Sequence, residues 1–231
     1  MKVALITGGS RGIGAAAVET FAKNGYTVIL NYNSSESKAK ALQRRLLAEN
    51  CDIHLYKADV SDIAEVSAMF GYVSKYFKHL DVLVNNAGIS CTAQIQDVTE
   101  AEFDSVMSVN AKGVYFCCKY ALPVLAKCNG TIINIASIWG VRGASCESVY
   151  AMSKHAVVGL TRSLALELSD FGITVNALCP PMVLTDMTSG YTKDEMSAFC
   201  ADTGTPIYSP KQIAQQIYDI ALSGLNGVVA E

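Results

Sequence analysis

Seven short runs rich in Val, Ile and Leu recur along the chain, separated by longer segments with a helical spacing of apolar residues. The runs lie at residues 2–7, 27–32, 52–57, 81–86, 130–136, 172–178 and 226–230. They are almost continuously apolar rather than alternating, which is typical of strands buried on both faces. The pattern predicts the α/β class, a parallel sheet of seven strands flanked by helices on both faces.

The strand and helix order predicts a doubly wound, Rossmann-type sheet whose strand carboxyl ends meet at one edge, where ligands bind. No repeat, linker or low-complexity segment interrupts the pattern, so residues 1–231 are expected to form a single dinucleotide-binding domain. Segment 180–208 is too long for a simple connector and holds three of the five prolines. We expect it to be a substrate-binding loop or lid.

Composition narrows the range of partners. Charged residues make up 17% and hydrophobic residues 51% of the chain, and the net charge is −3. No basic excess points to nucleic acid or to an anionic membrane surface. No apolar run approaches the roughly 18 residues of a membrane span, and no signal peptide precedes the first strand. We therefore expect a cytoplasmic protein whose partners are small molecules.

The eight cysteines form no CxxC pair, and none is adjacent to one of the three histidines. Several lie in apolar runs, so buried, reduced thiols are expected and no metal site is predicted.

The first apolar run ends in a glycine-rich turn, TGGSRGIG at residues 7–14. Glycines allow a tight turn and a close approach of the backbone to a diphosphate. The N-terminus of the following helix supplies free N–H groups and a positive dipole end. Because the turn joins the first strand to the first helix, it predicts a dinucleotide site.

The end of the second strand bears on the choice of nucleotide. An NAD-selective site usually carries an acid there, whereas this chain has Asn31, Asn33 and Ser34, and the nearest acid, Glu36, falls in the next helix. Arg11 is expected to meet a 2′-phosphate, with Asn33 and Ser34 adding hydrogen bonds. This predicts NADP(H). If Arg11 is only a solvated turn residue, the preference stays open.

Tyr150 and Lys154 are four residues apart in a segment with helical character, and therefore share one helix face. They could act together on one small molecule. Taken alone, the same spacing also fits a tyrosine ring packed on a lysine stem.

Several motifs follow one another in order along the chain: TGGSRGIG (7–14), Asp59-Val60, NNAG (85–88), Asn110, Ser137 and Tyr150-x-x-x-Lys154. Together they resemble the motifs of the short-chain dehydrogenase/reductase family, in particular the 3-oxoacyl-acyl-carrier-protein reductase branch of its classical subgroup. The similarity is continuous from residue 2 to about residue 185.

The resemblance implies hydride transfer between a nicotinamide and a carbonyl carbon, with Tyr150 as proton donor. It implies that Ser137 holds the substrate oxygen, that Lys154 binds the nicotinamide ribose, and that Asn110 positions a water. A phenol suited to this task needs a pKa lowered by roughly 3 units, or about 4 kcal/mol, and Lys154, aided by the cationic nicotinamide on the oxidised side, is the expected source.

The resemblance also implies a set of cofactor-binding residues, in which Asp59 and Val60 meet the adenine end. The set is Gly8, Ser10, Arg11, Gly12, Ile13, Gly14, Asn31, Asn33, Ser34, Asp59, Val60, Asn86, Ala87, Gly88, Tyr150, Lys154, Pro180, Val183 and Thr185.

The chain departs from this family at three places. Pro181 stands where relatives usually have glycine. The final residues lack the tail that helps relatives to form a tetramer, so a homodimer through helices around 99–127 and 149–169 and a homotetramer both stay open. Near the fifth and sixth strands, where carrier-protein reductases present basic residues, Lys127 is the only cation and Asp170 has the opposite sign.

These observations predict an NADP(H)-dependent oxidoreductase that interconverts a carbonyl and a secondary alcohol. The first expectation for its substrate is a 3-oxoacyl thioester, with acyl carrier protein as a partner. The alternatives are a reductase of a free ketone, sugar or steroid-like alcohol and, more remotely, a non-catalytic NADP sensor. Trp139 is expected either to line the substrate pocket or to pack beneath the loop above it.

Overall fold

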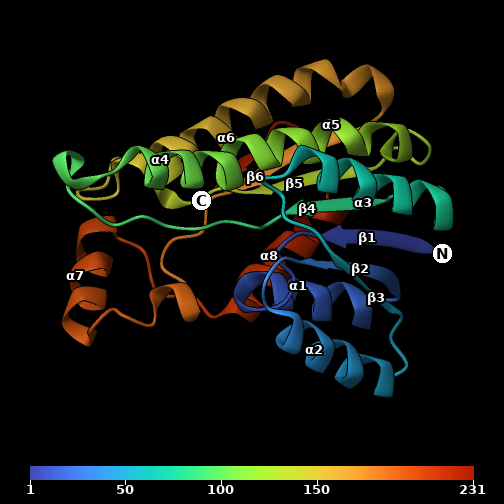
Figure 1. Ribbon diagram of the computed structural model, residues 1–231, viewed down its shortest axis with the longest axis horizontal. Coiled ribbons are helices and arrows are strands. Elements are labelled where there is room, and N and C mark those ends of the chain that lie inside the picture. The colour runs from blue at the N-terminus through green and yellow to red at the C-terminus, as the bar shows by residue number, and fades with distance from the viewer.

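A computed structural model describes all 231 residues and contains one seven-stranded sheet in the order β3-β2-β1-β4-β5-β6-β7 (Figure 1). Every neighbouring pair of strands is parallel. The predicted fold class is therefore confirmed, with each strand close to its expected range. The strands are β1 (Lys2–Ile6), β2 (Tyr26–Tyr32), β3 (Ile53–Lys57), β4 (Val82–Asn85), β5 (Thr131–Ile135), β6 (Thr174–Leu178) and β7 (Val229–Ala230).

Helices cover both faces of the sheet (Figure 1). One buried cluster packs α3, α5 and α6 on one face, and another packs α1, α2 and α8 on the other. Side chains of β1 alternate between them: Val3 and Leu5 join the first cluster, Ala4 and Ile6 the second. The helices are α1 (Gly12–Lys23), α2 (Glu36–Ala48), α3 (Ile63–Tyr76), α4 (Glu100–Met107), α5 (Val114–Leu125), α6 (Ser148–Glu167), α7 (Lys193–Thr203) and α8 (Pro210–Leu222).

The long helix expected around 99–127 is present and contains a widened turn. The π-helical turn Ser108–Gly113 joins α4 to α5, and the backbone stays helical on both sides of it. Asn110 lies in this turn and is fully buried. Such widened turns are frequent at functional sites, because they redirect a side chain that a regular helix would leave elsewhere.

The segment predicted as a loop or lid contains a helix. Residues Asp186–Thr188 form a short 3₁₀ turn, and α7 follows at Lys193–Thr203. A capping box between Thr192 and Glu195 begins α7, and Gly204, in the left-handed conformation at φ 68°, ends it. We call residues 180–208 the lid segment below.

The strand order reverses between β1 and β4, and in open parallel sheets this is where ligands bind. The glycine-rich turn after β1 and the NNAG motif after β4 meet at this point. No helix in the structure has both the length and the apolar character needed to cross a membrane.

Candidate active site

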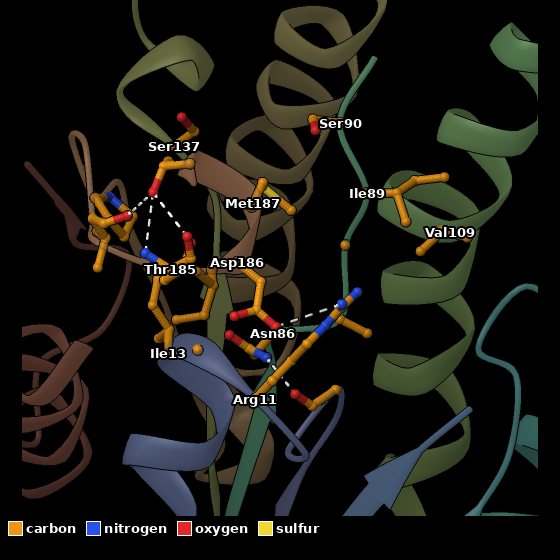
Figure 2. A pocket seen from close by; sticks show the side chains of 18 of the residues that line it. Arg11, Ile13, Asn86, Ile89, Ser90, Val109, Ser137, Thr185, Asp186 and Met187 are labelled. Atoms are coloured by element: carbon orange, nitrogen blue, oxygen red, sulfur yellow. Dashed lines mark hydrogen bonds and ion pairs between the residues drawn. The ribbon is translucent and has the colours of Figure 1, made fainter. Parts of the chain in front are cut away.

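A cavity of about 610 Å³ opens at the carboxyl ends of the strands, between the sheet and the lid segment (Figure 2). It is lined by residues that follow β1, β3, β4 and β6, by the ends of β2 and β5, by the start of α6 and by the lid segment. Of the site residues predicted from the sequence, all except Gly14 and Asn110 line it. The predicted residues are therefore brought to one place, although lining a cavity does not by itself assign a role to each.

The glycine-rich turn has the geometry that a diphosphate requires. Gly8 and Gly12 have φ values of +63° and +54°, which other residues adopt with strain. A Cβ on Gly14 would lie only 2.3 Å from the carbonyl oxygen of Gly8, so this glycine is needed for packing. Helix α1 begins at Gly12 without a side-chain cap, and its first N–H groups remain available to an anion. The turn fits the cofactor implied by the resemblance.

Thr7 and Asn86 join the turn to the end of β4. The hydroxyl oxygen of Thr7 accepts hydrogen bonds from the N–H groups of Asn86 at 2.9 Å and Ala87 at 3.0 Å. The side-chain amide of Asn86 donates to the carbonyl oxygens of Thr7 at 2.8 Å and Gly8 at 3.2 Å. Sequence analysis missed Thr7, although it opens the TGGSRGIG motif.

Asn31 also supports the turn. It is 1% exposed, its Oδ1 accepts from the Gly8 N–H at 3.3 Å, and its Nδ2 donates to the Ala58 oxygen at 3.0 Å. Its amide is therefore already engaged with the backbone, and it contributes to the site mainly by holding β1, β2 and β3 in register. Asn31 also lines the cavity, and the direct cofactor contact implied by the resemblance stays a prediction.

Two cations and one carboxylate meet beside the turn. Asp186 Oδ2 lies 2.6 Å from Lys38 Nζ and 3.9 Å from Arg11 Nη1. Figure 2 shows Arg11 extending toward Asp186. The Lys38 ammonium is the main cause that holds the pKa of Asp186 below its usual value. Neither Lys38 nor Asp186 was predicted as part of the site, because they are 148 residues apart and only the fold brings them together.

Three of the four residues predicted as catalytic converge on the cavity from β5 and α6. Ser137 follows β5, while Tyr150 and Lys154 share one face of α6. Lys154 is 4% exposed, donates to the Ile135 carbonyl oxygen at 2.8 Å, and has its Nζ 5.7 Å from the centre of the Tyr150 ring. Burial lowers the pKa of Lys154 to about 8.

The pKa of Tyr150 shifts in the direction opposite to our prediction. Burial raises it to about 12, and a hydrogen bond with Ser137 only partly offsets that effect. The expected lowering by Lys154 is wrong for the side chains alone, since burial dominates and the Lys154 ammonium is bonded to Ile135. At neutral pH Tyr150 therefore carries its proton.

Asn110 lies behind the cavity wall. Its Oδ1 accepts from the Ile89 N–H at 2.9 Å, and its Nδ2 donates to the Ile89 oxygen at 2.8 Å and to Ser153 Oγ at 3.0 Å. It thus fixes the chain after β4 against α6. The water-positioning role implied by the resemblance stays a prediction.

The other end of the cavity is aromatic and carries one acid. Trp139 lines it, as one of the two expectations held, and packs edge-on against Phe199 of α7, with ring centroids 5.5 Å apart. Glu147 lines it as well, and its carboxylate accepts a 3.4 Å hydrogen bond from the Tyr191 hydroxyl. The sequence pointed to the lid segment that contains Phe199 and Tyr191, but it gave no signal for Glu147.

The segment after β6 keeps its place against the cofactor turn despite Pro181. Pro180 accepts a 3.0 Å backbone hydrogen bond from Ile138, and a Cβ on Gly12 would lie 3.3 Å from Thr185 Cγ2. Thr188 Oγ1 donates to the Val183 oxygen at 2.7 Å. These contacts hold Thr185 beside the first turn of α1.

Comparisons with known proteins were made by sequence and by structure. A family model described as short chain dehydrogenase matches residues 2–196. Among curated proteins, 3-oxoacyl-[acyl-carrier-protein] reductase FabG of Staphylococcus aureus is 41% identical over 194 residues, which cover 84% of this chain and 79% of that protein. Meso-2,3-butanediol dehydrogenase of Serratia marcescens is 34% identical over 198 residues, covering 86% and 78%.

Two solved structures have a similar fold over almost the whole chain. A dehydrogenase/reductase from Sinorhizobium meliloti 1021 superposes with a TM-score of 0.92 and 31% identity, covering 99% of this chain and 92% of that one. Levodione reductase superposes with a TM-score of 0.90 and 31% identity, covering 99% and 95%.

Proposed function

The chain belongs to the short-chain dehydrogenase family and is an oxidoreductase of the carbonyl and alcohol class; from that premise we propose that it depends on NADP(H) and uses Tyr150 as its proton donor. One observation carries the proposal. Ser137, Tyr150 and Lys154 line the same cavity as the glycine-rich turn at the start of α1. A protein that only senses a nucleotide has no need of these three side chains beside the nucleotide site.

The residues suggest how the reaction proceeds. Nicotinamide, when bound, supplies or accepts the hydride. Tyr150 is protonated at neutral pH, with a pKa of about 12, and gives its proton to the substrate oxygen as the carbonyl carbon gains the hydride. The Ser137 hydroxyl orients that oxygen. The Lys154 ammonium lies 5.7 Å from the Tyr150 ring centre, and its attraction for the phenolate left behind is smaller than the opposing effect of burial.

Two features support NADP(H) over NAD(H). No acid ends β2, where Asn31 and Asn33 lie instead. Arg11 and Lys38 converge on one carboxylate oxygen of Asp186, beside the turn that would hold the diphosphate. A 2′-phosphate offers more acceptor oxygens and more negative charge to the same two cations.

For the substrate, the sequence relationship favours a 3-oxoacyl thioester, since the S. aureus relative at 41% identity is named for that reaction. A small free ketone or diol is a second candidate. The S. marcescens relative is named for a diol. Lys127 and Asp170 are both exposed, and together they offer an acidic carrier protein little attraction.

The test is a panel of carbonyl substrates assayed by NADPH oxidation. It contains acetoacetyl thioesters, 2-butanone, hydroxy ketones and cyclic ketones, each measured with NADPH and with NADH. We expect turnover of at least one substrate, with a higher kcat/KM for NADPH. Absence of turnover across the panel would refute the enzymatic proposal, and a higher kcat/KM for NADH would refute the assignment of Arg11.

A further inference from the structure

Glu147 places an uncompensated carboxylate at the substrate end of the cavity. It lies immediately before α6, three residues from Tyr150, and is half-buried. None of the ion pairs in the structure includes it. Its side chain does not cap α6, and its one hydrogen-bond partner is the Tyr191 hydroxyl at 3.4 Å.

This arrangement leaves most of the carboxylate without hydrogen bonds. An ionised carboxylate has about four acceptor positions, and a single long hydrogen bond occupies one of them. Removing a carboxylate partly from water costs free energy when no hydrogen-bond donors replace the water. Burial accordingly raises the pKa of Glu147. A ligand that brings a donor to this position would recover part of that cost.

The surroundings limit what such a ligand can be. Trp139 and Phe199 form an aromatic wall at this end, and Ser90 and Thr92 add small hydroxyl groups. Two cations line the cavity: Arg11 lies near Asp186, and the Lys154 ammonium is bonded to the Ile135 oxygen. An anionic group placed here would be repelled by the Glu147 carboxylate, with no counter-charge to offset the repulsion. A neutral hydrogen-bond donor would meet no such repulsion.

Glu147 also lies close enough to Tyr150 for both to act on one small substrate. Its charge contributes to raising the pKa of Tyr150. Glu147 is the N-cap residue of α6, at φ −125° and ψ 29°, and both side chains line the same cavity. A donor that reaches Glu147 while the carbonyl oxygen meets Tyr150 can therefore belong to the same small substrate.

We propose that Glu147 accepts a hydrogen bond from a hydroxyl group that the substrate carries beside its carbonyl, so that hydroxy ketones and the corresponding diols are the preferred substrates. The inference rests on the proposed carbonyl reduction at Tyr150. It favours the second substrate candidate, because the carbon next to the ketone of a 3-oxoacyl thioester carries no hydroxyl group.

The test compares a matched pair of ketones. Acetoin and 2-butanone differ by one hydroxyl group at the carbon next to the carbonyl. In the unmodified protein we expect kcat/KM with NADPH to be higher for acetoin by about tenfold or more, the range in which a buried acceptor discriminates against a missing donor. Glu147→Leu should remove this preference by lowering the value for acetoin while that for 2-butanone stays the same or rises.

Two further variants separate substrate recognition from a merely structural role. Glu147→Gln keeps an acceptor oxygen and should retain part of the preference. Tyr191→Phe removes only the hydrogen bond between the lid segment and Glu147. If Glu147 acted by holding the lid segment, Tyr191→Phe and Glu147→Leu would lower the values for both ketones alike, which would overturn the inference.

The outcomes distinguish this inference from the function on which it rests. If the unmodified protein reduces both ketones, or an acetoacetyl thioester, with no preference for the hydroxyl group, the role of Glu147 is refuted and carbonyl reduction stands. If it binds NADPH, measured by fluorescence titration, but reduces none of these compounds, the proposed function fails and the inference fails with it.

Discussion

Lys154 is only 4% exposed and carries a positive charge. Its ammonium has one hydrogen-bond acceptor, the Ile135 carbonyl oxygen. Burial lowers its pKa from 10.5 to about 8. A lowered lysine pKa means that the folded protein binds this proton less tightly than the unfolded chain does. The charge therefore costs stability at neutral pH, as expected where a group is kept for chemistry rather than for packing.

Lys154→Met should make the protein more stable and inactive. The substitution keeps the length of the side chain and removes the buried charge, and the pKa shift corresponds to a gain of roughly 3 kcal/mol in unfolding free energy at pH 7. The unfolded chain keeps this proton up to about pH 10.5, whereas the folded protein releases it near pH 8. The gain should therefore shrink as the pH rises from 8 to 10.5.

The measurement for Lys154→Met is urea unfolding of both proteins at several pH values. The difference between the two proteins isolates Lys154 from the thiols and phenols that also titrate in this range. A difference that does not change with pH, or a less stable variant, would contradict the account.

At this scale the sequence located Ser137, Tyr150 and Lys154, because their chemistry and spacing form a motif. It did not locate Glu147, whose importance depends on having no counter-charge in the cavity. It also gave the wrong direction for the pKa of Tyr150. Sequence spacing shows which groups are neighbours, but desolvation depends on everything that covers them.

Among the structural elements, the turn into α1 depends most closely on glycine. A Cβ on Gly14 would lie 2.3 Å from the Gly8 oxygen and 2.5 Å from Asn86 Nδ2. Gly14→Ala should therefore lower the unfolding free energy by about 3 kcal/mol through overpacking. It should also weaken NADPH binding, since α1 must move away from the turn.

Gly71→Ala is the matched control. Gly71 lies inside α3, and a Cβ there would meet nothing within 4 Å. The same chemical change should raise the unfolding free energy by about 0.5–1 kcal/mol, because alanine favours helix more than glycine does. Thermal unfolding of both variants measures the two changes in unfolding free energy. Equal changes in Gly14→Ala and Gly71→Ala would show that close packing at Gly14 does not cause the predicted loss.

The lid segment is tied to α1 and α2 through Asp186. Asp186→Asn should tighten NADPH binding by about threefold, a modest effect because Asp186, Arg11 and Lys38 are all more than half exposed. The physical reason is that the carboxylate competes with a 2′-phosphate for the two cations. NADH, which lacks this phosphate, should bind with unchanged affinity.

Fluorescence titration with both cofactors measures this effect, and Asp219→Asn provides the same change of net charge on α8, with a different hydrogen-bond partner. Weaker binding of both cofactors by Asp186→Asn would instead show that Asp186 serves to hold the lid segment in place.

Helices and strands were predicted well where a local sequence pattern determines them. They were predicted less well where contacts between distant parts of the chain determine them. The strands follow directly from their apolar runs. The widened turn between α4 and α5 was not predicted, because the contacts of Asn110 with Ile89 and Ser153 that accompany it have no local signature. Helix α7 has a capping box, but the prolines nearby favoured a loop.

The molecule as a whole leaves apolar side chains exposed along α4, α5 and α6. Phe103, Tyr115 and Met152 are 39%, 50% and 42% exposed. A groove between the π-helical turn, α5 and α6 is lined by Tyr115 and Leu160 among others. We propose that a second copy of the chain covers this face, as expected from the sequence.

Tyr115→Asp should shift the assembly toward the 24.6 kDa chain without reducing the helix content. Putting a charge into an apolar interface disfavours association, because the charge loses hydration there. Analytical ultracentrifugation gives the mass and circular dichroism the fold. An unmodified protein that sediments as the single chain at micromolar concentration would refute this interface.

The fold class followed from seven apolar runs because a parallel sheet covered on both faces has few alternatives once strands and helices alternate. The substrate did not follow from the sequence. It depends on how the lid segment, Trp139 and Glu147 are arranged around Tyr150, which only the folded chain shows.

The central claim is that Tyr150 donates the proton in an NADPH-dependent carbonyl reduction. It is tested most directly by kcat/KM for Tyr150→Phe with the best ketone of the panel. We predict a fall of about a hundredfold or more, with the Kd for NADPH unchanged, because only the proton is removed. A variant that keeps most of the kcat/KM of the unmodified protein would contradict the account.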